Sequence, residues 1–211
     1  MKPLCKSRQR KPRGYSAGLL NLRRNMNKFF KIPADVFHRN SDVSVGKEFY
    51  ILCYFYSISA LTGAASVRVK LPQIAQKMGV NHKDNVIRLI NKLVNYGYVT
   101  KRKIKNSFTL FPVVNEYTLT NPNPKDCILV PDYFLDIYVD EEIIKGNMLY
   151  LLIYLYSASD GKLSDCKIKL SDIVSATGFY PIKIAKFVKK LKTHGVIAKS
   201  FQIEYDAVKK K

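Results

Sequence analysis

Apolar side chains occupy nearly every position of two segments that lie 100 residues apart, GKEFYILCYFYSIS from Gly46 and GNMLYLLIYLYSAS from Gly146. An apolar pattern that runs round the whole circumference predicts a helix that is buried on more than one side. The two segments are identical at seven of their fourteen positions. A repeat with so long a period indicates a duplicated domain rather than a solenoid.

The duplication continues on both sides of these segments. Upstream, FFKIPADVF at 29–37 is similar to CILVPDYFL at 127–135. Downstream, the similar pairs are VKLPQIAQKMGV (69–80) with IKLSDIVSATGF (168–179), and NVIRLINKLVNYGYVTK (85–101) with KIAKFVKKLKTHGVIAK (183–199). We therefore expect three parts: a basic, partly disordered N-terminal arm at 1–28, a first domain at 29–120 and a second domain at 126–211.

Within each copy, a short strand, a short helix closed by a glycine, and a second, amphipathic helix follow the buried helix. The strands are expected at 67–69 and 167–169, and the short helices at 72–77 and 171–176. The second helices carry apolar residues spaced by three, one and three positions: Val86, Leu89, Ile90 and Leu93 in one copy, Ile184, Phe187, Val188 and Leu191 in the other. A glycine, Gly97 or Gly195, ends each of them before a β-prone stretch. The expected fold class is mainly α with small β, that is α+β.

This order of helix, tight turn, helix, glycine and basic strand resembles the winged helix-turn-helix family. The motifs that carry the resemblance are L-x-x-I-A-x-x-x-G-V at 71–80 and L-x-x-x-G-Y-V at 93–99, together with their counterparts at 170–179 and 191–197. The resemblance implies two tandem winged helices that bind double-stranded DNA. The turn between the paired helices is one residue longer in the first copy than in the second.

Charge strengthens the case for a polyanionic partner. Lys and Arg number 36 against 16 Asp and Glu, for a formal net charge of +20. Residues 1–31 contribute ten basic residues and no acid, which is half of that charge. Such an arm is expected to close on DNA, although RNA or membrane lipid would attract it too. The alternative is a basic protein whose charge serves solubility alone.

In a winged helix the second helix enters the major groove and the hairpin behind it contacts the backbone or minor groove. Amides suit adenine, arginine suits guanine, and lysines mostly hold phosphates, so the first copy is the better candidate for reading bases. Asn81 is expected either to contact DNA or to cap its helix, and both helix faces could instead be plain solvated surface. The expected DNA-binding residues are Asn81, His82, Lys83, Asn85 and Arg88 on the first helix, Lys101, Arg102, Lys103 and Lys105 on its wing, Tyr180, Lys183, Lys186, Lys189 and Lys190 on the second helix, and Arg8, Arg10, Lys11 and Arg13 in the arm. The second wing is expected to be weak, because AKSFQIEYDA has little charge.

A helix that is apolar nearly all round needs two packing partners. One hypothesis is an internal pseudo-dimer in which Tyr50 and Tyr54 pack against Tyr150 and Tyr154. The alternatives are that this helix is simply the domain core, or that it meets a second chain. The internal arrangement predicts a monomer or a weak homodimer that recognises a pseudo-palindrome with unequal half-sites.

Other chemistry has little support in the sequence. The four cysteines lack CxxC spacing and are expected to be reduced thiols, and the three histidines lack metal spacing. We expect no enzyme activity, no metal and no cofactor. The acids Asp132, Asp136, Asp140, Glu141 and Glu142 are interpreted as part of a solvated helix and its start. No signal peptide is apparent and the longest apolar run is too short to cross a bilayer, so a cytoplasmic protein without a membrane partner is expected.

The function expected is sequence-specific binding of double-stranded DNA. Tandem winged helices of this size resemble regulators and accessory factors of conjugative transfer, and replication initiators, from mobile elements of Gram-positive bacteria. The first group implies a regulator or DNA-processing factor of a plasmid, conjugative element or phage; the second implies an initiator that binds origin repeats. Relaxosome or replisome proteins are then possible partners. The alternative of another class is a protein-interaction adaptor.

Overall fold

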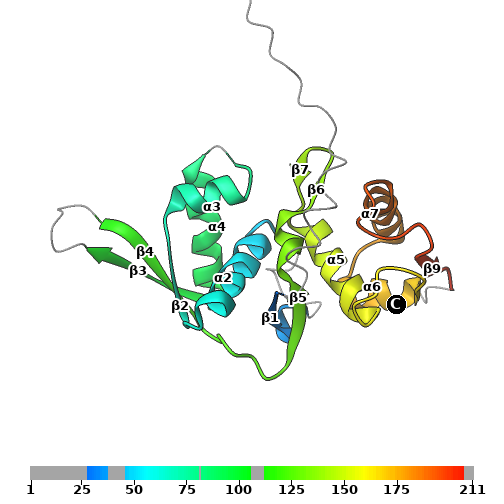
Figure 1. Cartoon of the computed structure of the whole chain (residues 1–211), viewed down its shortest axis with the longest axis horizontal. Coiled ribbons are helices and arrows are strands. Elements are labelled where there is room, and N and C mark those ends of the chain that lie inside the picture. Colours follow the sequence, from blue (N-terminus) through cyan, green and yellow to red (C-terminus); the bar gives the residue numbers. More distant parts are fainter. Residues whose placement is uncertain (1–27, 38–45, 81, 106–111, 207–211) are drawn as a thin grey trace, which may run out of the picture.

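The computed structural model describes residues 28–37, 46–80, 82–105 and 112–206. Within these ranges the chain is a mixed α/β structure with six α-helices and several small sheets (Figure 1). The elements of the first half, residues 28–120, are β1 (Phe29–Pro33), the 3-10 helix η2 (Ala34–Phe37), α2 (Glu48–Thr62), β2 (Ser66–Val69), α3 (Leu71–Lys77), α4 (Lys83–Asn95), β3 (Val99–Lys105) and β4 (Pro112–Leu119).

The second half, residues 126–206, repeats this order with one insertion and one loss. Its elements are β5 (Cys127–Pro131), the 3-10 helix η3 (Asp132–Asp136), β6 (Tyr138–Val139), β7 (Glu142–Ile143), α5 (Asn147–Ala158), β8 (Lys167–Lys169), α6 (Leu170–Thr177), α7 (Pro181–Thr193) and β9 (Gln202–Glu204). The short strands, short helices and second helices expected from the sequence are confirmed in both halves.

Helices α2 and α5 form the centre of the two halves. In α2 the side chains from Phe49 to Cys53 are all fully buried, as a helix that is apolar on every side requires. Helices α4 and α7 are buried along one face only. The turn that closes α6 depends on Gly178, which has φ +68° and donates its N–H to the Val174 carbonyl at 2.9 Å. Glycine adopts this left-handed conformation without strain.

The two halves differ in their sheets. In the first half β4 lies between β2 and β3, and both pairs are antiparallel. In the second half the stretch VIAKSFQI forms no hairpin. Residues 196–201 contain no strand, and β9 pairs with β8 directly and in parallel. The weak second wing expected from the sequence is therefore replaced by one short strand.

The halves join through a two-stranded ribbon at the centre of the molecule (Figure 1). Strand β1 pairs antiparallel with β5 from Phe29 opposite Pro131 to Pro33 opposite Cys127. The backbone hydrogen bonds that flank the ribbon are reciprocal: Ala34 donates to the Asp126 carbonyl and Asp132 to that of Lys28, each at 3.0 Å. Since each contact links one half to the equivalent atoms of the other, the ribbon has local pseudo-two-fold symmetry.

Two equivalent tyrosines extend this symmetry into the core. The hydroxyl of Tyr50 on α2 lies 2.7 Å from the carbonyl oxygen of Leu135, and that of Tyr150 on α5 lies 3.0 Å from the carbonyl oxygen of Phe37. Leu135 and Phe37 are themselves equivalent positions of η3 and η2. The tyrosines thus bond to the opposite half's backbone, which differs from the tyrosine-to-tyrosine packing expected from the sequence. The rings of Phe37 and Tyr150 stack with centroids 5.1 Å apart.

The acidic stretch of the second half has a different structure from the one expected. Asp132–Asp136 is a 3-10 helix, and the acids that follow it belong to a small hairpin of β6 and β7 rather than to a solvated α-helix. Asp140 and Glu141 form the hairpin turn and both have positive φ, 53° and 65°. The sequence interpretation failed because a two-residue turn between very short strands leaves little hydrophobic periodicity to detect.

Candidate nucleic-acid interface

Helix α4 presents a polar face to solvent. Val86, Ile90 and Leu93 are fully buried beneath it, which fixes the orientation of the helix. Asn85 and Arg88 are exposed on the opposite side, with the Arg88 guanidinium 3.5 Å from the Asn85 amide oxygen. Asn91 and Asn95, further along α4, are also exposed. An arginine among amides on an exposed helix is a suitable set for base edges in a major groove.

The beginning of α4 is only partly described. The N-cap position is occupied by His82, whose side chain is exposed. Asn81, with both of its expected roles, lies outside the described residues. Lys83 is the first residue of α4, but its side chain lies outside the described part of the chain.

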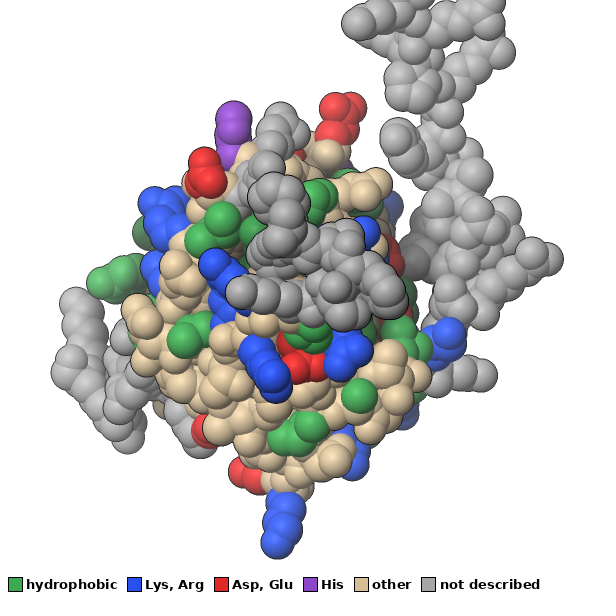
Figure 2. All heavy atoms as spheres, turned by 90° about the vertical axis from the view of Figure 1, so that its left-hand side faces the viewer, with side chains coloured by type: hydrophobic (Ala, Val, Ile, Leu, Met, Phe, Trp, Pro, Cys, Tyr) green, Lys and Arg blue, Asp and Glu red, His purple; other side chains and the backbone are tan. Residues whose placement is uncertain are grey.

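The hairpin of β3 and β4 projects from the first half and divides its basic residues between two faces (Figure 1). Lys101 and Lys103 lie on the same face as the buried Val99, because alternate residues of a strand share a face. Arg102 lies on the other face, opposite Glu116, which also pairs with Arg68 at 2.9 Å. Figure 2, which faces this side of the molecule, shows Lys and Arg side chains spread over it.

Helix α7 has five lysines and no acidic residue. Lys186 and Lys189 are exposed. At the first turn, Tyr180 is 80% and Ile182 84% exposed, the two most exposed large apolar side chains among the described residues. The sequence reading included Tyr180 but missed Ile182. A signal was present, because Ile182 lies two positions before the buried Ile184, about 200° away round a helix.

Two of the α7 lysines that were expected to contact DNA have partners within the protein. The Lys183 ammonium lies 4.5 Å from the centroid of the Phe179 ring, and partial burial lowers its pKa. Lys190 forms an ion pair with Asp140 of the β6–β7 hairpin. His194 approaches the same carboxylate at 3.0 Å. The hydrogen bond from Lys190, followed by that from His194, holds the pKa of Asp140 below its ordinary value.

The hairpin thus places negative charge against the last turns of α7, a contact that the sequence analysis did not anticipate. Asp140 and Lys190 are 50 residues apart, and no local pattern links them. The hairpin also approaches the first half: the Ile143 side chain lies about 4 Å from the position that a β-carbon on Gly79 would take. Nearby, Lys145 donates to the Met78 carbonyl at 3.0 Å. The β6–β7 hairpin therefore lies close both to the turn between α3 and α4 and to α7.

Several predicted positions cannot be placed on this surface. The arm residues and one wing side chain lie outside the described part of the structure: Arg8, Arg10, Lys11, Arg13 and the side chain of Lys105. Of the remaining positions, His82, Asn85, Arg88, Arg102, Lys103, Tyr180, Lys186 and Lys189 are exposed.

Neither metal-binding clusters nor membrane-spanning helices occur in the ranges that the structure covers. No group of three or more His, Cys, Asp and Glu side chains is arranged to hold a metal ion there. Of the described helices, none combines the length and apolar character needed to cross a bilayer. Cys53, Cys127 and Cys166 are unpaired, and burial raises the pKa of the Cys53 thiol.

Comparisons with known proteins add no further information on this surface. No protein-family model, curated protein or solved structure gives a significant match to the chain.

Proposed function

We propose that the chain binds double-stranded DNA through two winged helix-turn-helix units, with α4 and α7 as the helices that enter the major groove. The observation that carries this proposal is the order of elements round α4. A short helix, a tight turn and a polar, exposed second helix are followed by a hairpin that carries Lys101, Arg102 and Lys103. This set of elements suits a groove contact followed by a backbone contact.

The two helices are proposed to have different tasks. Asn85 and Arg88 of α4 supply the directional donors and acceptors that distinguish bases. Lys186 and Lys189 of α7 supply positive charge without direction, which suits phosphates. The exposed Ile182 is suited to apolar contact with a thymine methyl group, so the second unit would add some preference for A·T pairs.

The reciprocal contacts between the halves support a pseudo-palindromic site. If β1, β5 and the two tyrosines set the orientation of the halves, α4 and α7 meet two half-sites related by an approximate two-fold axis. The unlike faces of α4 and α7 predict half-sites of unlike sequence.

The biological role that fits such a protein is a regulator or accessory DNA-processing factor of a plasmid, conjugative element or phage, acting in the cytoplasm without catalysis. A replication initiator is the other role of the same class. Footprinting on the DNA that flanks the gene separates them, because direct repeats indicate an origin and one imperfect palindrome indicates a promoter or transfer site.

Salt dependence and three substitutions test the binding mode. With roughly 6–8 phosphate contacts, the slope of log K against log salt is expected near −5 to −7. Arg88→Ala is expected to cost about 1–3 kcal/mol on the specific site and to relax sequence preference, whereas Lys186→Ala is expected to weaken all sequences alike. Ile182→Ala should reduce only the preference for thymine at its contact. A flat salt response would instead favour a protein-interaction adaptor, and identical behaviour of the Arg88 and Lys186 variants would refute the division of tasks.

A further inference from the structure

The space beside β9 corresponds to a strand that the first half has and the second half lacks. In the first half β4 pairs with β2 on one edge and with β3 on the other. In the second half β9 takes the place next to β8, and none of the described strands lies along its other edge. In the described part of the second half, no strand therefore fills the place that β3 occupies in the first half.

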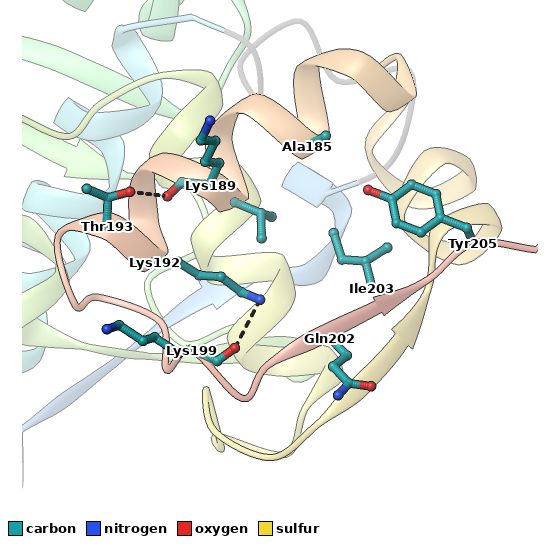
Figure 3. A pocket seen from close by; sticks show the side chains of 9 residues that line it. Ala185, Lys189, Lys192, Thr193, Lys199, Gln202, Ile203 and Tyr205 are labelled. Carbon is teal, nitrogen blue, oxygen red and sulfur yellow. Dashed lines mark hydrogen bonds between the residues drawn. The ribbon is translucent and has the colours of Figure 1, made fainter.

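A groove of about 560 Å³ occupies this position, between α7 and β9 (Figure 3). Ala185 and Val188 contribute the apolar wall on the helix side, and Ile203 contributes it on the strand side. The Ile203 side chain points from β9 towards α7, whereas the Gln202 side chain points away from it (Figure 3). No residue of β8 lines the groove, so the groove lies on the side of β9 away from β8.

The backbone of β9 has hydrogen-bonding capacity on this side. Gln202 donates its N–H to the Cys166 carbonyl at 2.8 Å, towards β8. Successive residues of a strand direct their N–H and C=O groups to alternate sides, so those of Ile203 point away from β8. An unpaired strand edge of this kind is a template for another extended chain.

The charge round the groove indicates which kind of segment binds there. Lys189, Lys192 and Lys199 stand round the groove, and the Lys192 ammonium donates to the Lys199 carbonyl at 3.3 Å (Figure 3). The extended or terminal segments of this chain are themselves basic: KRKIK of the wing, VKKK at the end and the acid-free residues 1–31. They would be repelled, and the apolar walls do not suit a phosphate backbone.

We propose that this groove binds an extended, acidic segment of a partner protein, which adds to β9 as a third strand. The main-chain groups of Ile203 supply hydrogen bonds, the apolar walls take alternate side chains, and the lysines pair with acids on the segment. This site goes beyond the proposed DNA binding but borders it. Lys189 lines the groove and is also one of the lysines proposed to hold phosphate, whereas Val188 and Lys192 lie further round α7 from Lys186.

A labelled peptide of about seven residues that alternates valine with glutamate tests the proposal on the full chain. Fluorescence anisotropy is expected to give saturable binding with a Kd below about 1 mM. A valine–lysine peptide of equal length should not bind. Methylating alternate backbone nitrogens of the acidic peptide, in one of the two registers, should abolish binding, since the methyl groups remove the donors. Hydrogen exchange at the Ile203 amide should slow when the unmethylated peptide is present.

Variants separate this site from the rest of the surface. Lys192→Glu with Lys199→Glu is expected to weaken peptide binding about tenfold, and Ala185→Phe, which fills the groove without changing charge, should weaken it as much. Lys162→Glu makes one such lysine-to-glutamate change on an exposed loop after α5 and should have no effect. The proposal is overturned if the peptide fails to saturate, if both methylated forms bind as well as the parent, or if Lys162→Glu matches the groove variants.

Discussion

The Tyr50 hydroxyl offers a direct test of how the two halves are held together. Its ring is fully buried, and its oxygen lies 2.7 Å from the Leu135 carbonyl of the other half and 3.0 Å from the Lys77 carbonyl of its own half. Burial is the main reason that the pKa of Tyr50 lies well above its usual range, so the hydroxyl remains a donor at every accessible pH. Tyr50→Phe removes this donor and leaves buried carbonyls without it.

The size of the effect follows from that geometry. A buried hydrogen bond contributes about 1 kcal/mol, and an acceptor left unsatisfied adds a further penalty of similar size, so a loss of about 2 kcal/mol is expected. With an m-value of roughly 2.5 kcal/mol per molar, the urea midpoint would fall by about 0.8 M. Equilibrium unfolding followed by circular dichroism measures both quantities.

Tyr54→Phe is the matched control on the same helix. Tyr54 is half-buried and makes no hydrogen bond to the residues that the structure describes, so its loss should cost less than about 0.5 kcal/mol. Equal midpoints for the two variants would refute the reasoning, because they would show that the contact with Leu135 contributes no measurable stability. DNA affinity at low temperature should be the same for both, since neither side chain lies on the proposed interface.

Two further predictions concern α7 and the turn before it. Asp140→Asn should raise DNA affinity several-fold and steepen the log–log salt slope by about 0.9, because Lys190 becomes available to a phosphate. Glu141→Gln, beside it in the same turn, is the charge-matched control and should change both the affinity and the slope less. The pKa of Asp140 is lowered in the folded protein, so its pairing with α7 is present above the ordinary aspartate pKa of about 4 and is lost as pH falls through the lowered value. An NMR titration of the Asp140 carboxylate would follow this loss, and an unshifted pKa would contradict the contact. Gly178→Ala should destabilise the protein by about 1 kcal/mol in thermal unfolding because its φ is +68°, whereas Ser175→Ala, exposed in the preceding turn, should be neutral.

Helix positions were predictable because their signals are local. The spacing of Val86, Ile90 and Leu93 defined both the extent of α4 and its buried face before any contact was known. Gly97 and Gly178 marked helix ends because a left-handed turn there leaves few other residue choices. The repeated order of elements was predictable because the same apolar spacing and glycine positions occur in both halves.

Strand pairing in the second half was not predictable in this way. The stretch VIAKSFQI has the composition of a strand, but its pairing depends on what lies beside β8, which is 35 residues away in the chain. The loss of a hairpin left β9 in direct contact with β8, and the groove beside it follows from that change.

The sequence by itself determined the duplication, the helices with their buried faces and the concentration of positive charge, because all of these depend on residue type and on spacing along the chain. Only the tertiary structure decided which basic residues of α7 face solvent. Lys186 and Lys189 are exposed, whereas Lys183 lies over the Phe179 ring and Lys190 is paired with Asp140. The physical reason is that a charged side chain responds to whichever rings and carboxylates folding brings within a few ångströms, and those partners come from distant parts of the chain as well as near ones.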